Sequence, residues 1–369
     1  MPTIKDYGYR IVNLEVTNRC NMACSFCPLP IREKALQDIA VKDTFWLLET
    51  LAGIGGVDFV AFHQYGEPLL YKGIWDCITC ARELGLKTQL VTNGLLLTDR
   101  NIEKLLQHPP NDLRISAQTL NPAYHAATRG VDVPFEVYID RVARCLATLL
   151  DRDHGIGKVR TDLAVNEDRH YGVHGKIHYL AQVAGIAVGG DPTINDETPK
   201  TLRPHLIGFL KQIELHSRSF TFSLTHLDDC LDQYYSHSAT RNLWETAYEF
   251  GPNNSVTYKR FVNGRRISQH YPVERSACGT EIIGILADGT VTACCSDYQG
   301  FTGLGNIFNE DLISILDRNQ AILDGLHRTG TLHFDGCKTC QGAPTRFGAI
   351  VKNVRNRFRY PAADPFYDS

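Results

Sequence analysis

Short runs of β-branched and apolar residues alternate with longer amphipathic stretches through the first two-thirds of the chain. In the stretch at 41–54, Phe45, Leu48 and Ala52 recur at steps of three and four residues, which is the period of a helix. The short runs have the length and composition of strands. The predicted strands are 11–16, 57–62, 87–92, 112–117, 158–165 and 186–189. Repeated strand–helix units of this kind predict an α/β fold with a parallel sheet and helices outside it.

Polar residues within the strands indicate what the sheet faces. In the fourth predicted strand, Leu113 and Ile115 share one face, whereas Arg114 and Ser116 share the other. The first and fifth strands alternate in the same way. An open parallel sheet covered on both faces would show nearly continuous apolar runs. We therefore predict a partial (β/α)6 TIM-like barrel whose polar inner face surrounds a wet lumen suited to a polar substrate.

The pattern changes after about residue 215, where aromatic residues and histidine become frequent and a bridge containing a helix is expected. Two hairpin-like stretches follow, and Asn263-Gly264 and Asp288-Gly289 are favourable turn dipeptides for them. A helix at 310–326 precedes a final Cys-x-x-Cys pair. The predicted organisation is a barrel at 8–215, a bridging segment at 216–270, a small α+β domain at 271–345 and a tail at 346–369.

Composition and charge narrow the function classes. A net charge of −3 gives no strong positive field that would recruit nucleic acid or anionic lipid, so neither is expected as a partner. The N-terminus lacks the apolar core of a signal peptide, and no apolar run is long enough to span a bilayer. We therefore expect a cytoplasmic protein. In a reducing compartment, its 12 cysteines favour metal binding over a disulfide framework.

Three cysteines lie close together directly after the first predicted strand, at Cys20, Cys24 and Cys27. A structural zinc site normally needs four ligands, so zinc would require a further side chain such as His63. Three thiolates can instead hold three irons of a [4Fe–4S] cluster and leave the fourth iron open to a chelating cosubstrate. The sequence favours the cluster over zinc.

This cysteine spacing resembles that of the radical S-adenosylmethionine (radical SAM) enzymes, and Phe26 before the last cysteine fits the same pattern. The segment "YGEP" at 65–68 resembles the Gly-Glu-Pro motif of that family, and "TNG" at 92–94 ends the third predicted strand. The resemblance spans roughly residues 8–215. It implies a set of residues that bind S-adenosylmethionine, with Glu67 on the methionine amino group. The implied set is Glu67, Asn93, Ser116, Arg129 and Asn166.

A second group of cysteines follows in the C-terminal third of the chain. This region resembles the SPASM extension of radical SAM proteins and its shortened form, twitch, which hold auxiliary clusters. Spacing alone would also allow zinc. The resemblance implies one auxiliary [4Fe–4S] cluster with ligands Cys278, Cys294, Cys337 and Cys340. Cys295 is then surplus, as a spare ligand, a buried thiol or a hydrogen-atom donor to a substrate radical, and Cys230 in the bridge is a second candidate donor.

The resemblance implies a reductive cleavage of S-adenosylmethionine to a 5′-deoxyadenosyl radical that abstracts a hydrogen atom from the substrate. A flavodoxin or ferredoxin would supply the electron. We expect a small polar substrate, such as an amino sugar, aminocyclitol or nucleoside, which is oxidised or epimerised in natural-product biosynthesis. The alternatives are an enzyme that crosslinks or epimerises a peptide, and a non-catalytic electron-transfer protein. No segment before residue 11 is long enough for a cobalamin domain or an extra peptide-binding domain.

Overall fold

The computed structural model describes residues 2–165, 197–236, 244–251, 253–260, 270–276, 278, 281–343 and 345–359. The sixth predicted strand at 186–189 and the predicted turn at Asn263-Gly264 lie outside these residues. No helix within the described ranges has the length and apolar character needed to cross a membrane.

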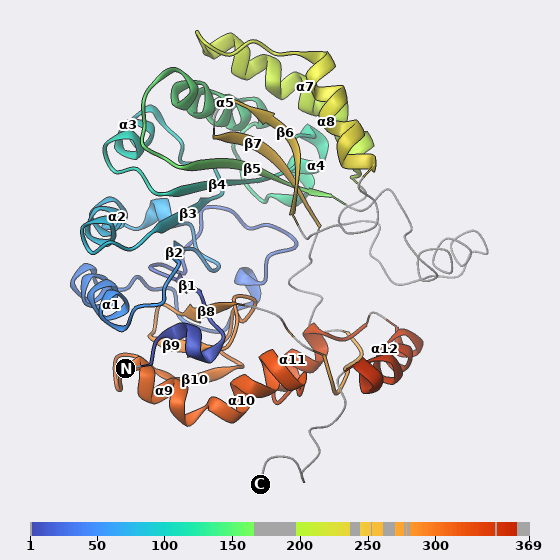
Figure 1. Ribbon diagram of the computed structural model, residues 1–369. Helices are drawn as coiled ribbons and strands as arrows, with labels where there is room; N and C mark the ends of the chain where they lie inside the picture. The colour runs from blue at the N-terminus through green and yellow to red at the C-terminus, as the bar shows by residue number, and fades with distance from the viewer. Residues whose placement is uncertain are drawn as a thin grey trace.

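The ten strands found in the described part of the chain belong to one sheet, in the order β10-β9-β8-β1-β2-β3-β4-β5-β7-β6 (Figure 1). Its barrel part is β1 Ile11–Leu14, β2 Phe59–Phe62, β3 Thr88–Thr92, β4 Asp112–Gln118, β5 Lys158–Val165, β7 Asn254–Arg260 and β6 Trp244–Phe250. Its C-terminal part is β8 Ile282–Ile285, β9 Thr290–Thr292 and β10 Gly303–Asn306. The strands β1, β2, β3, β4, β5 and β7 run parallel, which confirms the predicted α/β fold with a parallel sheet.

Helices cover the outside of this sheet, and α1, α2, α3 and α5 lie along the strands from β1 to β5 (Figure 1). The first half contains α1 Val41–Ile54, α2 Ile74–Glu83, α3 Asp99–Gln107, α4 Pro122–Thr128 and α5 Phe135–Asp151. The second half contains α7 Pro199–His216, α8 Leu224–Ser236, α9 Leu312–Arg318, α10 Gln320–Asp324, α11 Asp335–Cys340 and α12 Arg346–Arg359. The core lies between the two layers, where Leu47, Leu48 and Leu51 of α1 are fully buried.

The sixth parallel strand comes from the predicted bridging segment. β7 pairs with β5 from Val159–Asn254 to Val165–Arg260, and it forms an antiparallel hairpin with the preceding β6. β7 is thus paired with the strand that precedes it, and the hairpin expected around Asn263-Gly264 stays a prediction because that turn lies outside the described residues. The domain boundaries predicted at 215 and 270 stay predictions. Among the described residues, strands from before 215, from between 215 and 270 and from after 270 all belong to the same sheet.

The C-terminal region continues the same sheet on its other side. β8 pairs in parallel with β1, from Ile11–Ile282 to Leu14–Ile285. β8 and β9 then form the predicted hairpin around Asp288-Gly289, where Gly289 has a φ of +82°. A Cβ at Gly289 would also collide with the ring of Phe308. Both the positive φ and this close contact therefore favour glycine at this turn.

Candidate functional site

The loop with the first three cysteines leaves the carboxyl end of β1. Cys27 N donates to Cys24 O over 3.1 Å, and Ala23 N donates to Gly130 O over 3.2 Å. Gly130 has a φ of +56°, and a Cβ there would lie 2.5 Å from Ala23 O. Glycine is therefore required where this loop contacts the end of α4. The contact ties the loop of Cys20, Cys24 and Cys27 to the chain that follows α4.

Glu67 lies in the loop after β2 and is only 1% exposed. Its carboxylate accepts hydrogen bonds from Leu69 N over 3.0 Å, Thr92 Oγ1 over 2.8 Å and Asn93 N over 2.7 Å. Burial raises the pKa of Glu67 to about 7, although these hydrogen bonds act to lower it. Glu67 is thus a fixed, buried acceptor, as the predicted contact with an amino group requires.

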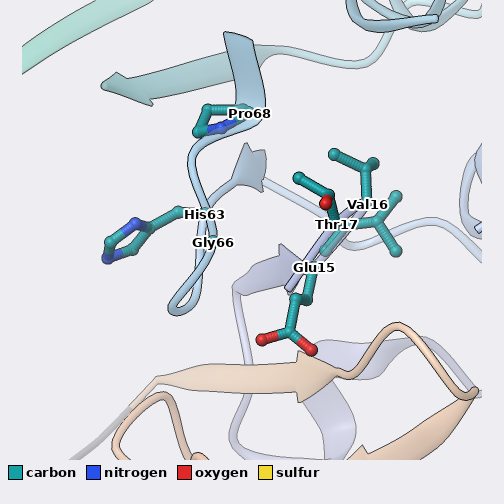
Figure 2. Close-up of a pocket in the computed structure, with 7 residues that line it drawn as sticks. Glu15, Val16, Thr17, His63, Gly66 and Pro68 are labelled. Atoms are coloured by element: carbon teal, nitrogen blue, oxygen red, sulfur yellow. The ribbon is translucent and has the colours of Figure 1, made fainter. Parts of the chain in front are cut away.

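Gly66 brings the Glu67 loop directly against the chain that follows β1. A Cβ on Gly66 would lie 1.9 Å from Thr17 O, which is an impossible contact with a backbone atom. Figure 2 shows the Gly66 loop beside Glu15, Val16 and Thr17, with His63 and Pro68 lining the same small pocket. The glycine before Glu67 is therefore a packing requirement.

Asn93 connects Glu67 with the first cysteine loop. Its backbone N–H donates to Glu67, while its Nδ2 donates to Asn21 Oδ1 over 2.8 Å and contacts Cys20 Sγ at 3.7 Å. Tyr138 Oη of α5 donates to Asn93 O over 3.0 Å. The structure thus brings the predicted residues Cys20, Glu67 and Asn93 together at one end of the barrel.

Arg129 lies beside both Ser116 and the loop that carries Cys24. Arg129 Nη2 donates to Ser116 O over 3.1 Å, and Arg129 O is 3.7 Å from Cys24 Sγ. The Arg129 side chain is buried, and its Nε has no hydrogen-bond partner among the described residues. An unpartnered buried guanidinium nitrogen beside the cysteine loop suits an anionic group such as a carboxylate. Asn166 lies outside the described residues.

The second group of cysteines lines a separate pocket that is partly open to solvent. All four predicted ligands line it, namely Cys278, Cys294, Cys337 and Cys340. Among the described residues, no group of three or more His, Cys, Asp or Glu side chains meets the geometry for holding a single metal ion. The four thiols line one pocket, so they can approach a single bound group together.

Cys295 lies beside this cavity, next to Tyr65. Tyr65 Oη donates to Ser296 O over 2.9 Å. Burial raises the pKa of Tyr65 well above its usual value, and the charges of Cys295 and Cys27 raise it further. Tyr65 is therefore close to both groups of cysteines. Cys230 lies elsewhere, on α8, where its sulfur is 3.8 Å from His226 Nε2.

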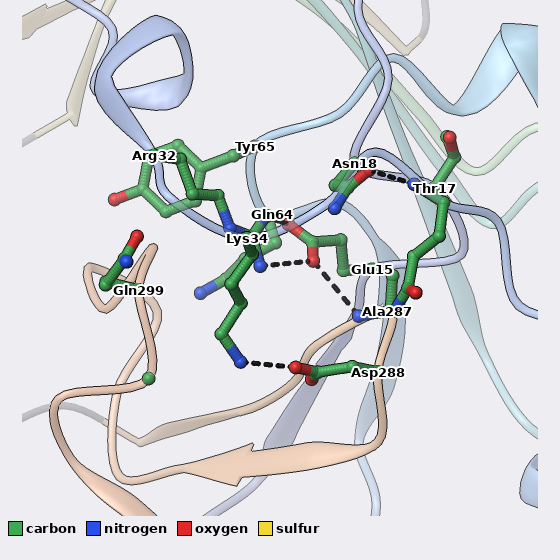
Figure 3. A network of polar contacts seen from close by, with 12 residues as sticks. Glu15, Thr17, Asn18, Arg32, Lys34, Gln64, Tyr65, Ala287, Asp288 and Gln299 are labelled. Atoms are coloured by element: carbon green, nitrogen blue, oxygen red, sulfur yellow. Dashed lines mark hydrogen bonds and ion pairs between the residues drawn. The ribbon is translucent and has the colours of Figure 1, made fainter.

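A polar network joins the barrel to the C-terminal region (Figure 3). Glu15 of the chain after β1 and Arg32 form an ion pair of 2.8 Å with side chains 0% and 2% exposed, respectively. Glu15 Oε2 also accepts a hydrogen bond from Ala287 N over 3.0 Å, and Lys34 pairs with Asp288 at 2.5 Å. These contacts fix the position of the second group of cysteines relative to the first.

The inner face of the barrel carries a further cluster of His63, Arg114, Asp162 and Lys259. Arg114 Nη2 lies 3.2 Å from Asp162 Oδ2. Burial, and then the charges of Arg114 and Lys259, lower the pKa of His63 to about 3. Sequence reasoning placed Arg114 and Asp162 on a polar face but missed Lys259. Its alternation with Thr257 in "SVTYKR" was the available signal.

Two family models match the chain. The Radical SAM superfamily model matches residues 14–154, and the iron-sulfur cluster-binding domain model called SPASM matches residues 278–341. The two matches cover the first and the second group of cysteines, respectively.

Among curated proteins, the PqqA peptide cyclase of Xanthomonas oryzae pv. oryzae is 33% identical over 114 residues. That of Xanthomonas campestris pv. campestris has the same identity over the same length. Each match covers 30% of this chain and 30% of the relative, so the chain matches less than a third of these relatives' length.

Solved structures share the fold at low identity. The structure described as native anSMEcpe with bound AdoMet has a TM-score of 0.50 at 12% identity, with 95% of this chain and 96% of that chain covered. Streptococcus suis SuiB bound to S-adenosylmethionine gives 0.49 at 17% identity, with 88% and 70% covered.

Proposed function

Because the chain belongs to the radical SAM superfamily and carries a C-terminal SPASM domain, we propose that it is a peptide-modifying radical SAM enzyme. Its cofactors are a [4Fe–4S] cluster, an auxiliary iron–sulfur cluster and S-adenosylmethionine. The curated relatives with PqqA peptide cyclase activity support a peptide substrate. They favour the peptide alternative over the small polar substrate that the sequence alone suggested. A flavodoxin or ferredoxin is proposed as the electron donor.

One contact carries the assignment of the first site. Asn93 binds both the Glu67 carboxylate, through its backbone, and the loop of Cys20, through its side chain. In the proposed arrangement, Cys20, Cys24 and Cys27 hold the [4Fe–4S] cluster, and Glu67 accepts hydrogen bonds from the methionine amino group. Together, the cluster and S-adenosylmethionine supply a one-electron cleavage whose product can abstract hydrogen from an unactivated carbon.

The other residues orient the cosubstrate and exclude water. The buried Arg129 guanidinium would pair with the methionine carboxylate, and Ser116 would contact the ribose, beside Arg129. Tyr138 donates a hydrogen bond to the backbone carbonyl of Asn93 and so helps to hold the Asn93 backbone, whose N–H binds Glu67. Orientation by residues that are themselves buried and bonded reduces the entropy lost when the reactants bind.

The auxiliary cluster is assigned to Cys278, Cys294, Cys337 and Cys340, because these four thiols line one cavity. Cys295 lies between this cavity and Tyr65, so we retain it as a spare ligand or a hydrogen-atom donor. Cys230 stays a second candidate donor. Its contact with His226 on the outer α8 gives no support for that role. Oxidation, crosslinking and epimerisation of the peptide all follow from the same first hydrogen abstraction.

The radical SAM step is tested by anaerobic reconstitution with iron and sulfide, followed by addition of dithionite and S-adenosylmethionine. The reconstituted protein should release 5′-deoxyadenosine. A variant with Cys20, Cys24 and Cys27 all replaced by alanine should release none. Cys80→Ala, which removes a thiol on α2, should behave as the parent protein. Release by the triple variant would contradict the site.

The peptide assignment needs a separate measurement. Pools of short peptides, and separately pools of amino sugars and nucleosides, are added to the reconstituted protein. Peptides should increase the rate of 5′-deoxyadenosine release and acquire a change in mass. Stimulation by the small polar compounds alone would overturn the peptide assignment and leave the radical SAM step intact.

A further inference from the structure

Helix α12 is attached to the C-terminal region through its polar side. It follows α11 at one end of that region (Figure 1). Asn356 Nδ2 donates to Arg275 O over 2.6 Å, and Asn353 Oδ1 accepts a hydrogen bond from Glu274 N over 2.9 Å. The buried residues of α12 are Ala349 and Asn356. A surface helix normally buries its apolar side instead, so the orientation of α12 is the reverse of the usual one.

The apolar side of α12 is exposed. Four large apolar side chains recur at steps of three, four and four residues, and we call them the apolar stripe. They are Phe347, which is 73% exposed, Ile350, 54%, Val354, 53%, and Phe358, 85%. At about 100° per residue, Phe347, Val354 and Phe358 fall within roughly 40° of one another around the helix axis. Single exposed apolar residues are common, but a continuous stripe of them marks an interaction site.

The charged residues of α12 are all basic. The helix contains no Asp or Glu, and its five cations are Arg346, Lys352, Arg355, Arg357 and Arg359. Lys352 acts within the protein, where its Nζ donates to Gln341 O. Arg355 and Arg357 are exposed. Around the helix axis they lie about 80° to either side of Phe347, so the apolar stripe has a cation on each flank.

Charge and shape together indicate what covers the apolar stripe. Glu274, which is bonded to Asn353 of α12, pairs through its carboxylate with Lys338 at 3.5 Å. A second copy of the chain would bring two equally basic helices together, which like-charge repulsion disfavours. A protein partner would need an apolar groove with an acidic rim on each side. A convex ridge with cations on both flanks instead suits the flat surface of an anionic lipid bilayer.

We propose that α12 binds the surface of an anionic lipid bilayer and lies in the plane of that surface. The apolar stripe enters the boundary between headgroups and acyl chains, and Arg355 and Arg357 extend to the lipid phosphates. This inference goes beyond the proposed function and does not depend on it. The net charge of −3 led us to expect no lipid partner. At a surface, however, only the charge within about 10 Å acts at 0.1 M salt, and on α12 that charge is positive.

The test measures vesicle binding by the reconstituted full-length protein. The protein is mixed with vesicles of phosphatidylcholine alone, or of phosphatidylcholine and phosphatidylglycerol in equal amounts, and is floated through a sucrose gradient without air. The fraction that floats with the anionic vesicles should be about tenfold or more above the fraction that floats with the neutral ones. It should fall in about 1 M salt, which screens the arginines from the phosphates.

Two double variants separate the apolar and the electrostatic contributions. Phe347→Gln with Phe358→Gln should remove flotation with the anionic vesicles, because no large aromatic side chain is then left to insert. Arg355→Gln with Arg357→Gln should lower it about tenfold or more. All four side chains are exposed, so both variants should fold, and the thermal unfolding midpoint verifies this.

A matched control lies on α7. Leu215 is 80% exposed, and Lys211, one helical turn before it, is also exposed. Lys211→Gln with Leu215→Gln therefore removes one cation and one exposed apolar side chain elsewhere on the surface. This variant should float with the anionic vesicles as the unaltered protein does.

The lipid site would be overturned if the unaltered protein did not float with the anionic vesicles, or if it floated equally with both kinds. Flotation of either folded α12 variant at the level of the unaltered protein would overturn it too. Sedimentation without lipid tests the second copy. A dimer that Phe347→Gln with Phe358→Gln abolishes would assign the apolar stripe to that copy and overturn the proposal. The release of 5′-deoxyadenosine, measured separately, tests the proposed function.

Discussion

Gly66 is the residue at which the sequence has the least freedom. It precedes Glu67, and its Cα faces the backbone of Thr17 too closely for any side chain. The space is set by two loops that follow adjacent strands, β1 and β2. The position of the Glu67 carboxylate therefore depends on the preceding residue, Gly66, having no Cβ.

Gly66→Ala should destabilise the protein strongly, by more than about 3 kcal/mol, because one of two backbone segments must move. It should also weaken S-adenosylmethionine binding, since Glu67 moves with its loop. The matched control is Gly53→Ala, where a Cβ in α1 would meet nothing within 4 Å. That change should be neutral or stabilise by up to about 1 kcal/mol. Urea denaturation measures both, and an unaltered midpoint for Gly66→Ala would contradict the packing argument.

The adjacent cysteines of the second group should differ in iron binding. Cys294 lines the cavity with three other thiols, whereas Cys295 lies beside it near Tyr65. Cys294→Ser should therefore lose the auxiliary cluster, and Cys295→Ser should keep it. Iron analysis and visible absorption after anaerobic reconstitution distinguish them. A loss of iron in Cys295→Ser alone would reverse the ligand assignment.

At the scale of single residues, the sequence predicted which residues belong to the candidate site better than it predicted the contacts between them. Cys20, Glu67 and Asn93 are recognisable from their motifs. The contact between Asn93 and Cys20 is not, because the two residues lie 73 positions apart in the sequence. Lys259 was missed because its own segment marks it only by its alternation with Thr257. Its meaning depends on strands β4 and β5, which bring Arg114 and Asp162 beside it.

At the scale of elements, local periodicity was sufficient for some segments and not for others. The helix at 41–54 and the strand at 158–165 match their predictions to the residue, since each buries a regular pattern of side chains. β7 was not placed, because its partner β5 lies about ninety positions away and strand pairing at that distance leaves no local pattern. The helix predicted at 310–326 is instead two shorter helices, α9 and α10. Asn319 is the C-cap residue of α9 and the N-cap residue of α10.

The start of the connection between α7 and α8 depends on one carboxylate at the end of α5. Asp151 accepts hydrogen bonds from Ser217 Oγ over 2.7 Å, Arg218 N over 2.7 Å and Ser219 N over 3.0 Å. Burial alone would raise the pKa of Asp151, but these bonds lower it to about 2. The carboxylate therefore favours the folded state in its ionised form.

Asp151→Asn should lower the free energy of unfolding by about 1 kcal/mol at neutral pH, a value reduced by the exposure of this site. Because the pKa is lower in the folded protein, the contribution is present above the ordinary aspartate pKa and is lost as the pH falls toward 2. The difference from the parent should thus shrink in strong acid. Asp153→Asn, an exposed carboxylate nearby, serves as the control, and an equal effect there would contradict the assignment.

At the scale of the molecule, the barrel and the C-terminal region are joined by buried charge. Glu15 and Arg32 are almost fully enclosed, and Glu15 also accepts the Ala287 N–H from the C-terminal region. Burial raises the pKa of Glu15, and Arg32 opposes that rise. The pair therefore connects both regions at the cost of desolvating two ions.

Arg32→Met should lower the free energy of unfolding by about 3–5 kcal/mol, because it leaves the Glu15 carboxylate buried without its partner. A carboxyl whose pKa is raised in the folded state loses stability as the pH rises. The variant should thus be most impaired in mildly alkaline solution and least in mild acid. Thermal denaturation across that range measures the trend.

Two further variants complete this test. Adding Glu15→Gln to Arg32→Met should recover much of the loss, since no buried charge remains. Arg10→Met breaks an exposed pair with Asp58 and should cost at most about 1 kcal/mol. A cost for Arg32→Met as small as that of Arg10→Met would contradict the connecting role of the buried pair.

The pairing of β8 with β1 has a practical consequence for anyone who cuts the chain. A fragment that ends before β8 leaves the backbone N–H and C=O groups on one edge of β1 unpaired, in a strand whose apolar residues Val12 and Leu14 are buried. An exposed edge strand of this kind can pair with strands from other copies of the protein. The isolated barrel should therefore self-associate and precipitate, and the two cysteine-bearing regions are best expressed and handled as one piece.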